Sequence, residues 1–143
     1  MTLVEFLKAR LDEDEAIART AADDPGIGER WEGDHDSVRN ADADGSGFIA
    51  VGPWESGVGA FGPHAACHDP ARVLREVEAK RRIMARHKIG DPAYGWPPRS
   101  CEGCGEVGEI CDPRVDDIDK CPELRDLAAV YSDHPDYRQE WAP

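Results

Sequence analysis

Residues 101–105 are Cys-Glu-Gly-Cys-Gly, two cysteines separated by two residues with a glycine directly after the second. Two thiolates at this spacing can bind one metal ion, and the glycine permits the tight turn that brings them together. The motif lies within residues 89–121, which contain several prolines and glycines and show little hydrophobic periodicity. Because a loop of that length needs something to order it, we expect a metal ion to organise this part of the fold.

Further ligands for such an ion lie nearby along the chain, at His87, Cys111 and Cys121. Structural Zn2+ takes four tetrahedral nitrogen or sulfur ligands, so an all-cysteine set and a three-cysteine, one-histidine set both fit. We favour structural zinc bound by His87, Cys101, Cys104 and Cys121, with Cys111 as the alternative fourth ligand. Free or redox-active thiols and a catalytic metal are the competing interpretations.

Three helices are predicted around this loop, over residues 1–22, 69–88 and at the start of 122–143. Thr2 and Glu5 form a capping-box pattern at the first, Asp69 is the expected N-cap of the second, and Pro122 lies in the first turn of the third. The apolar residues expected to be buried are Leu3, Val4, Leu7, Leu11 and Ile17 in the first helix, Val73, Leu74, Val77, Ile83 and Met84 in the second, and Leu124, Leu127 and Val130 in the third.

Residues 27–66 are rich in glycine, aspartate and tryptophan. Their apolar residues fit short strands broken by turns, which predicts a small β-hairpin or meander. The strand candidates are Trp31, Val38, Phe48, Ile49, Val51 and Trp54. Residues 42–49 resemble the start of a calcium-binding loop, but the twelfth position is Pro53 where a bidentate glutamate is required, so a turn is favoured. The expected fold is a single α+β domain over residues 1–143.

Charge and composition exclude several classes of protein. The 143 residues carry 30 acidic and 17 basic side chains, a net charge of −13, which argues against a general nucleic-acid binder. No apolar run is long enough to span a bilayer, and the N-terminal residues lack the basic start of a signal peptide. We therefore expect a reducing cytoplasm, where metal binding explains five cysteines better than disulfides do.

The charge is distributed unevenly along the chain. Residues 61–90 hold seven basic and three acidic side chains, whereas the segments before and after carry net charges of −9 and −8. The arginines that could contact an anion or an acidic partner are Arg72, Arg75, Arg81, Arg82 and Arg86. A solvated helix face that complements the acidic residues 12–15 of the first helix is the simpler interpretation.

Catalytic patterns are sparse. His64, Cys67 and His68 lie close together in the sequence, but His68 precedes Asp69-Pro70 and fits a capping or packing role at a helix start. The chain contains no nucleophile elbow, no phosphate-binding glycine loop and no His-Glu-x-x-His pattern. The sequence therefore favours a protein without catalytic activity.

Three segments carry a resemblance to a known family: residues 68–82 (HDPARVLREVEAKRR), 121–125 (CPELR) and 131–141 (YSDHPDYRQEW). With residues 2–18 they resemble small proteins of unknown function from actinobacteria and their phages, over about half of the chain. The resemblance implies no activity. It implies a histidine that ends the long helix and a cysteine pair before the Cys-Pro-x-Leu-Arg segment, which correspond to His87, Cys101, Cys104 and Cys121. The acidic insert 106–120, which contains Cys111, departs from the family pattern.

The leading functional hypothesis is a small zinc-stabilised protein, host- or phage-encoded, that acts as a non-catalytic interaction or regulatory module. It would contact an unidentified protein partner through its acidic surface, with carboxylates that imitate the phosphates of DNA as one variant. Nucleic-acid binding through the basic central helix and a zinc-dependent enzyme are the alternatives. A zinc enzyme requires an open coordination position at the metal.

Overall fold

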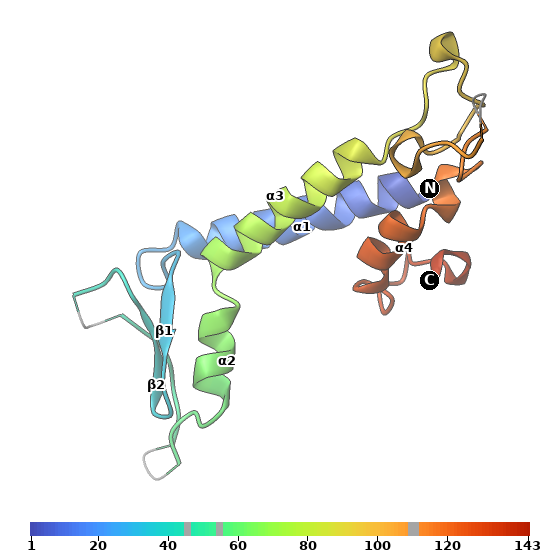
Figure 1. Ribbon diagram of the computed structural model, residues 1–143. Helices are drawn as coiled ribbons and strands as arrows, with labels where there is room; N and C mark the ends of the chain where they lie inside the picture. Colours follow the sequence, from blue (N-terminus) through green and yellow to red (C-terminus); the bar gives the residue numbers. More distant parts are fainter. Residues whose placement is uncertain (45–46, 54–55, 109–111) are drawn as a thin grey trace. The chain divides into compact units, whose positions relative to one another are not determined.

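The computed structural model describes residues 1–44, 47–53, 56–108 and 112–143 (Figure 1). It has the predicted α+β fold, and no helix in these ranges is both long and apolar enough to cross a membrane. Trp54, Cys111 and part of the calcium-loop resemblance lie outside the described residues. The main elements are α1 (Leu3–Ala22), β1 (Trp31–Gly33), β2 (Ser37–Asn40), β3 (Phe48–Val51), α2 (Phe61–Cys67), α3 (Pro70–Arg86) and α4 (Pro122–Ala129).

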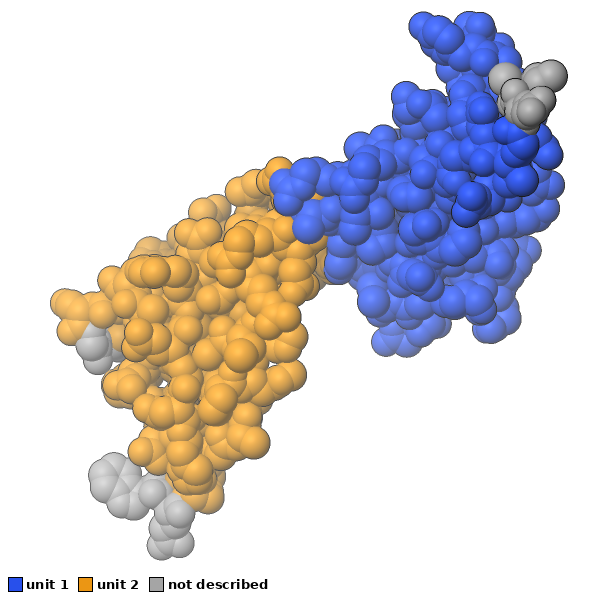
Figure 2. Space-filling view, in the orientation of Figure 1, with its two compact units in different colours: residues 1–12, 79–143 blue, residues 13–78 orange. Residues whose placement is uncertain are grey.

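The chain forms two compact units (Figure 2). The metal unit comprises residues 1–12 and 79–143, and the sheet unit comprises residues 13–78. Both α1 and α3 contribute residues to each unit. The interpretation of the chain as one domain stays a prediction.

Helices α1 and α3 begin where their capping residues predict. At α1 the Glu5 N–H donates to Thr2 Oγ1 at 3.2 Å, and the Thr2 N–H donates to Glu5 Oε2 at 2.8 Å. The bond from the Thr2 backbone lowers the pKa of the Glu5 carboxyl. At α3 the Arg72 N–H donates to Asp69 Oδ1 at 2.7 Å. These side chains satisfy backbone donors that have no partner within the helix.

The core of the metal unit is built on one stripe of α1. Its fully buried side chains are Leu3, Phe6, Leu7 and Leu11 from α1, with Ile118, Leu124 and Trp141 from the C-terminal part. Phe6 and Trp141 lie in contact, with ring centroids 5.1 Å apart. The C-terminal segment returns Trp141 to the body through a short 3-10 helix over Gln139–Trp141.

Two of the residues expected to be buried are exposed. Ile17 is 66% exposed, whereas Ala18 is buried. Seven residues make nearly two helical turns, so Ala18 follows Leu11 along the buried stripe and Ile17 lies off it. Val130 is 63% exposed because it follows the last residue of α4.

The sheet unit contains a three-stranded antiparallel meander in the order β1-β2-β3. Val38 in the central strand is fully buried and pairs with Gly33 and Ala50. The segment 27–66, predicted to be β-rich, also contains most of a short helix that the sequence did not predict, because α2 begins at Phe61. Its N-cap, Ala60, makes no side-chain bond, so this helix has no capping signal and depends on packing against β1 and β2.

Candidate metal centre

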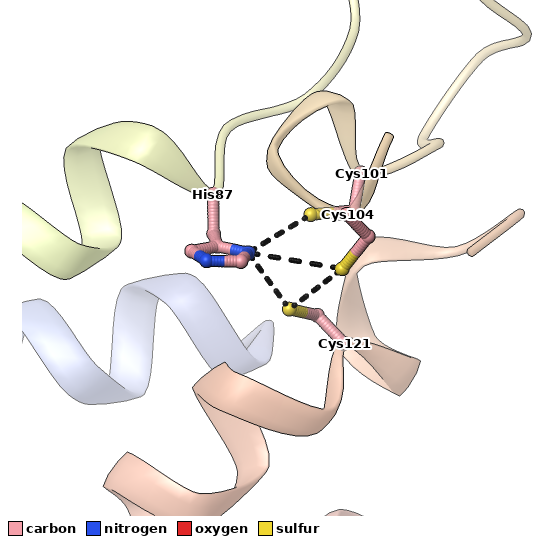
Figure 3. Close-up of side chains that lie close together, drawn as sticks. All are labelled: His87, Cys101, Cys104 and Cys121. Carbon is pink, nitrogen blue, oxygen red and sulfur yellow. Dashed lines mark hydrogen bonds between the residues drawn. The ribbon is translucent and has the colours of Figure 1, made fainter. Parts of the chain in front are cut away.

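Four side chains from three separate segments converge in the metal unit (Figure 3). Nδ1 of His87 lies 3.6 Å from Cys101 Sγ, 3.7 Å from Cys104 Sγ and 3.4 Å from Cys121 Sγ. The sulfurs of Cys104 and Cys121 are 3.5 Å apart, and all four ligand atoms lie within 4.8 Å of one another. The structure therefore brings together the histidine set that the sequence favours.

The three Nδ1···Sγ separations and the Cys104–Cys121 separation are close to the edges of a zinc coordination tetrahedron. With Zn–S bonds of about 2.3 Å and Zn–N bonds of about 2.0–2.1 Å, a tetrahedral site has S···S edges of about 3.8 Å and S···N edges of about 3.6 Å. The observed separations between Nδ1 and the sulfurs run from 3.4 to 3.7 Å. Soft thiolates with one imidazole are ligands that suit Zn2+ and do not suit hard cations such as Mg2+ or Ca2+. The donor set and its spacing fit a zinc ion.

The two glycines of the knuckle set its position against the end of α3. A Cβ atom on Gly103 would lie 2.3 Å from the carbonyl oxygen of Arg86, so only glycine allows this approach. Gly105 has φ of 75°, a left-handed conformation that glycine adopts without strain. His87 directly follows α3, so the close contact at Gly103 brings the knuckle cysteines to the imidazole.

Backbone bonds hold the two buried cysteines in place. The Cys101 N–H donates to the carbonyl of Val115 at 2.9 Å, across the metal-binding loop. Cys121 is the N-cap residue of α4, and its N–H donates to the carbonyl of Ile118 at 3.0 Å. Both side chains are fully buried. The backbone on either side of the cluster is therefore fixed by hydrogen bonds.

Burial opposes the ionisation of these thiols in the absence of a cation. It raises the pKa of Cys121 to about 11 and raises the pKa of Cys104 still further above the usual value. Each thiol must lose its proton to bind a metal, so a metal ion supplies the positive charge that burial of several thiolates requires. The cluster is therefore costly to ionise without a cation, and its four side chains could hold a metal ion such as zinc.

The family model of a family of unknown function (DUF6221) matches residues 1–143. The chain belongs to this family. The match confirms the resemblance to a family of unknown function and extends the matched length from about half of the chain to residues 1–143, while the actinobacterial or phage origin stays a prediction. No curated protein and no solved structure matches the chain. Membership of DUF6221 carries no activity, so the function has to be argued from the site itself.

Glu123 borders the cluster, which the sequence did not predict. Its Oε2 lies 3.4 Å from Cys121 Sγ, 3.5 Å from Cys104 Sγ and 3.9 Å from His87 Nδ1. Its own backbone N–H lowers the pKa of the carboxyl, which keeps it ionised. The only signal in the sequence was its position in the first turn of α4, where a helix dipole favours a carboxylate.

A second group of residues, also missed from the sequence, supports the loop before α4. Asp119 Oδ1 accepts a hydrogen bond from the Leu3 N–H at 3.1 Å and so satisfies a free donor at the start of α1. Its Oδ2 pairs with Arg99 at 3.0 Å, and Arg99 also pairs with Asp117 at 2.7 Å. Arg99 has φ of 70°, a strained value for a residue with a Cβ, so these contacts hold its backbone in place.

The five arginines proposed as anion or partner contacts do not lie in one unit. Arg72 and Arg75 belong to the sheet unit, whereas Arg81, Arg82 and Arg86 belong to the metal unit. Arg72 pairs with Glu76 at 2.7 Å, and Arg81 pairs with Asp12 of α1 at 2.6 Å. The second pair confirms the predicted contact between the basic segment and the acidic first helix.

The other motifs assemble no metal centre. Asp42, from the calcium-loop resemblance, forms an ion pair with Arg30, and this bond lowers the pKa of its carboxyl. His68 is the C-cap of α2, and its ring packs on His64 with centroids 4.7 Å apart, beside the exposed Cys67. Within the described ranges, the cluster at His87 is the one group of three or more metal-ligating side chains whose ligand atoms all lie within 4.8 Å of one another.

Proposed function

We propose that this DUF6221 protein is a zinc-stabilised, non-catalytic interaction module of the reducing cytoplasm. The observation that carries the proposal is the convergence of His87, Cys101, Cys104 and Cys121, whose ligand atoms all lie within 4.8 Å of one another. Four protein ligands leave no open position for a water or a substrate, which a zinc enzyme needs. The ion would join the end of α3, the knuckle and the start of α4.

The distribution of charge between the units supports an interaction role. The sheet unit contains 15 acidic and 5 basic side chains, whereas the metal unit contains 15 acidic and 12 basic ones. The sheet unit also exposes Phe48 and Val51 of its edge strand β3. An acidic surface that includes exposed apolar side chains suits a partner protein with a basic surface.

Nucleic-acid binding through the central helix has weaker support. A phosphate-binding surface needs several uncommitted cations on one face. Arg72 and Arg81 already pair with carboxylates, and the five arginines of the proposed contact are divided between the two units. The overall charge of −13 further opposes the approach of a polyanion.

The acidic contact is tested with a variant that removes charge without removing internal bonds. Asp23, Glu29 and Glu32 of the sheet unit are exposed, and their carboxylates make no hydrogen bond or ion pair among the described residues. The triple variant Asp23→Asn, Glu29→Gln, Glu32→Gln should therefore fold like the parent chain. We expect it to lose the protein partner that the tagged parent chain captures from host lysate, and we expect moderate salt to weaken that capture.

The matched control removes three charges from the metal unit. Asp126, Asp133 and Asp136 are exposed and likewise make no side-chain bond that the fold depends on. The variant Asp126→Asn, Asp133→Asn, Asp136→Asn should retain the partner. If both triple variants lose the partner protein equally, or both still capture it equally, the acidic side chains of the sheet unit do not make the contact. Elemental analysis of the same samples should find one zinc per chain.

A further inference from the structure

A cavity of about 660 Å³ lies beside the metal centre, entirely within the metal unit. Its floor is formed by Leu11 of α1, Met84 of α3 and Ile118, three apolar side chains that are otherwise buried. Val4 and Ile89 extend the apolar lining. The volume falls within the range of about 300–1,000 Å³ that is typical of small-molecule sites.

The cavity is lined by positive charge, although the unit around it is net negative. Four cationic side chains line it, against the carboxylates of Glu5 and Asp12. The cationic residues are Lys8, Arg81, Lys88 and Arg99. An apolar floor with an excess of cations at its edge is complementary to an amphipathic anion.

Lys8 is the cation that remains available to such a ligand. The others pair with carboxylates, in the contacts Arg81–Asp12, Lys88–Glu102 and Arg99–Asp117. Lys8 makes no hydrogen bond or ion pair among the described residues. Its ammonium group can therefore bind an anion without breaking an internal pair.

His87 offers a second free donor to the same cavity. Its Nδ1 faces the three sulfurs, and its other ring nitrogen points away from them (Figure 3). An ion bound at Nδ1 places the proton on Nε2, and metal-bound histidines usually donate that proton to a carboxylate, a carbonyl or water. None of the described residues accepts a hydrogen bond from His87 Nε2, and the side chain lines the cavity.

The antiparallel course of the two helices brings Lys8 and His87 to the same stretch of the cavity. The Arg81–Asp12 pair aligns α3 with α1 in the metal unit (Figure 1). One turn toward the start of α1 reaches Lys8, and the corresponding step toward the end of α3 reaches Ala85 and then His87. All of these residues line the cavity.

We propose that this cavity binds a small amphipathic carboxylate, with its apolar body on the floor and its carboxylate bound by Lys8 and the His87 N–H. The contribution of His87 rests on the proposed zinc ion, which sets its tautomer. A carboxylate fits better than a neutral ligand of equal size because it accepts a charge-assisted bond from Lys8 as well as the bond from His87.

Titration of the full-length, metal-loaded chain with octanoate tests the site, with 1-octanol and octylamine as neutral and cationic probes of equal length. We expect saturable octanoate binding by calorimetry, with amide NMR shifts at the lining residues. Octanol should bind about tenfold more weakly or worse, which corresponds to one lost charge-assisted bond. Octylamine should not bind.

Two variants and a control identify the contacts. Lys8→Met keeps the apolar stem and should weaken octanoate binding about tenfold without changing octanol binding. Lys120→Met makes the same charge change outside the cavity and should leave both unchanged. Ala85→Phe fills the cavity from α3 and should abolish binding of both probes.

The outcomes separate this proposal from that of the zinc-stabilised module, because zinc content and circular dichroism are measured on the same samples. Absence of octanoate binding by a folded chain that holds one zinc would overturn the ligand site alone. Equal weakening by Lys8→Met and Lys120→Met would also overturn it, because it would indicate a general effect of charge. A folded chain without zinc would contradict the proposed function. In that case, weaker octanoate binding by Lys8→Met than by the parent chain would still support the role of Lys8, and equal binding would overturn it.

Discussion

Loss of one cysteine from the cluster should unfold the metal unit. Cys104→Ser replaces a sulfur that lies 3.5 Å from Cys121 Sγ with an oxygen that is a poor zinc ligand. Cys67→Ser makes the same chemical change at an exposed cysteine of the sheet unit, outside the cluster, and is the matched control. Treatment of the parent chain with a chelator removes the ion without any change of sequence.

The size of the effect follows from the helices of each unit. A structural zinc ion contributes about 10–16 kcal/mol to a small domain, which is comparable to or larger than a total stability of about 5–15 kcal/mol. The described α-helices contain 52 residues, of which 26 lie in the metal unit and 26 in the sheet unit. Loss of the ion should therefore remove about half of the helical signal if the units fold independently. It should remove nearly all of it if the chain is one cooperative domain.

Far-UV circular dichroism measures this loss, with the metal content of each sample determined by elemental analysis. The parent chain and Cys67→Ser should hold one zinc per chain and give the same spectrum. Cys104→Ser and the chelated parent should lose helicity, and added zinc should restore the chelated parent. The fraction of helical signal that is lost also shows whether the chain is one cooperative domain, as predicted from the sequence, or two units that fold independently.

Two results would refute the reasoning. A purified parent chain that contains no metal and keeps its full helicity in chelator would show that the cluster is four free side chains that happen to be close. A Cys67→Ser variant that loses as much helicity as Cys104→Ser would show that the effect does not depend on the cluster.

Three further measurements test the site and the core. Metal binding near neutral pH should release at least two protons, because cysteines bind zinc as thiolates but are largely protonated at this pH without the ion, and burial raises the pKa of Cys104 and of Cys121 further. Calorimetry in buffers of different ionisation enthalpy counts these protons, and metal affinity should rise with pH. Phe6→Ala should lower the free energy of unfolding by about 3–5 kcal/mol in a denaturant titration. Phe61→Ala, at a half-exposed side chain, should lower it far less. Asp119→Ala should cost about 1–3 kcal/mol in the same assay, because it leaves the first N–H of α1 without its partner.

The candidate metal cluster could be predicted from the sequence because its chemistry is local. The knuckle at residues 101–105 combines two candidate ligands and a turn glycine within five residues, and the N-cap Asp69 and the first-turn Pro122 locate the helices that flank it. Once the end of α3 and the start of α4 are known, His87 and Cys121 are the ligands that those ends supply. Local signals therefore narrowed the ligands to these four side chains and Cys111, and the family resemblance favoured His87 over Cys111.

Contacts between distant segments could not be predicted in this way. Asp119 bonds to Leu3 across 116 positions of the sequence, and no local pattern indicates that pairing. Helix α2 has no capping side chain, so its sequence contains no start signal, and packing against the sheet determines it. Phe6 was missed for a related reason, because its burial depends on the aromatic side chains of the C-terminal segment.

The net charge differs between the two compact units in a way that the charges of the sequence segments do not show. By sequence segment, residues 61–90 form a basic island between two acidic arms. The boundary at residues 78–79 cuts through that island and assigns five of its seven basic side chains to the metal unit. With those five, the metal unit has a net charge of −3, and the sheet unit has a net charge of −10. The acidic character that suggested a basic partner therefore belongs to the sheet unit, and the excess of cations beside the metal centre is what makes an anionic ligand plausible there.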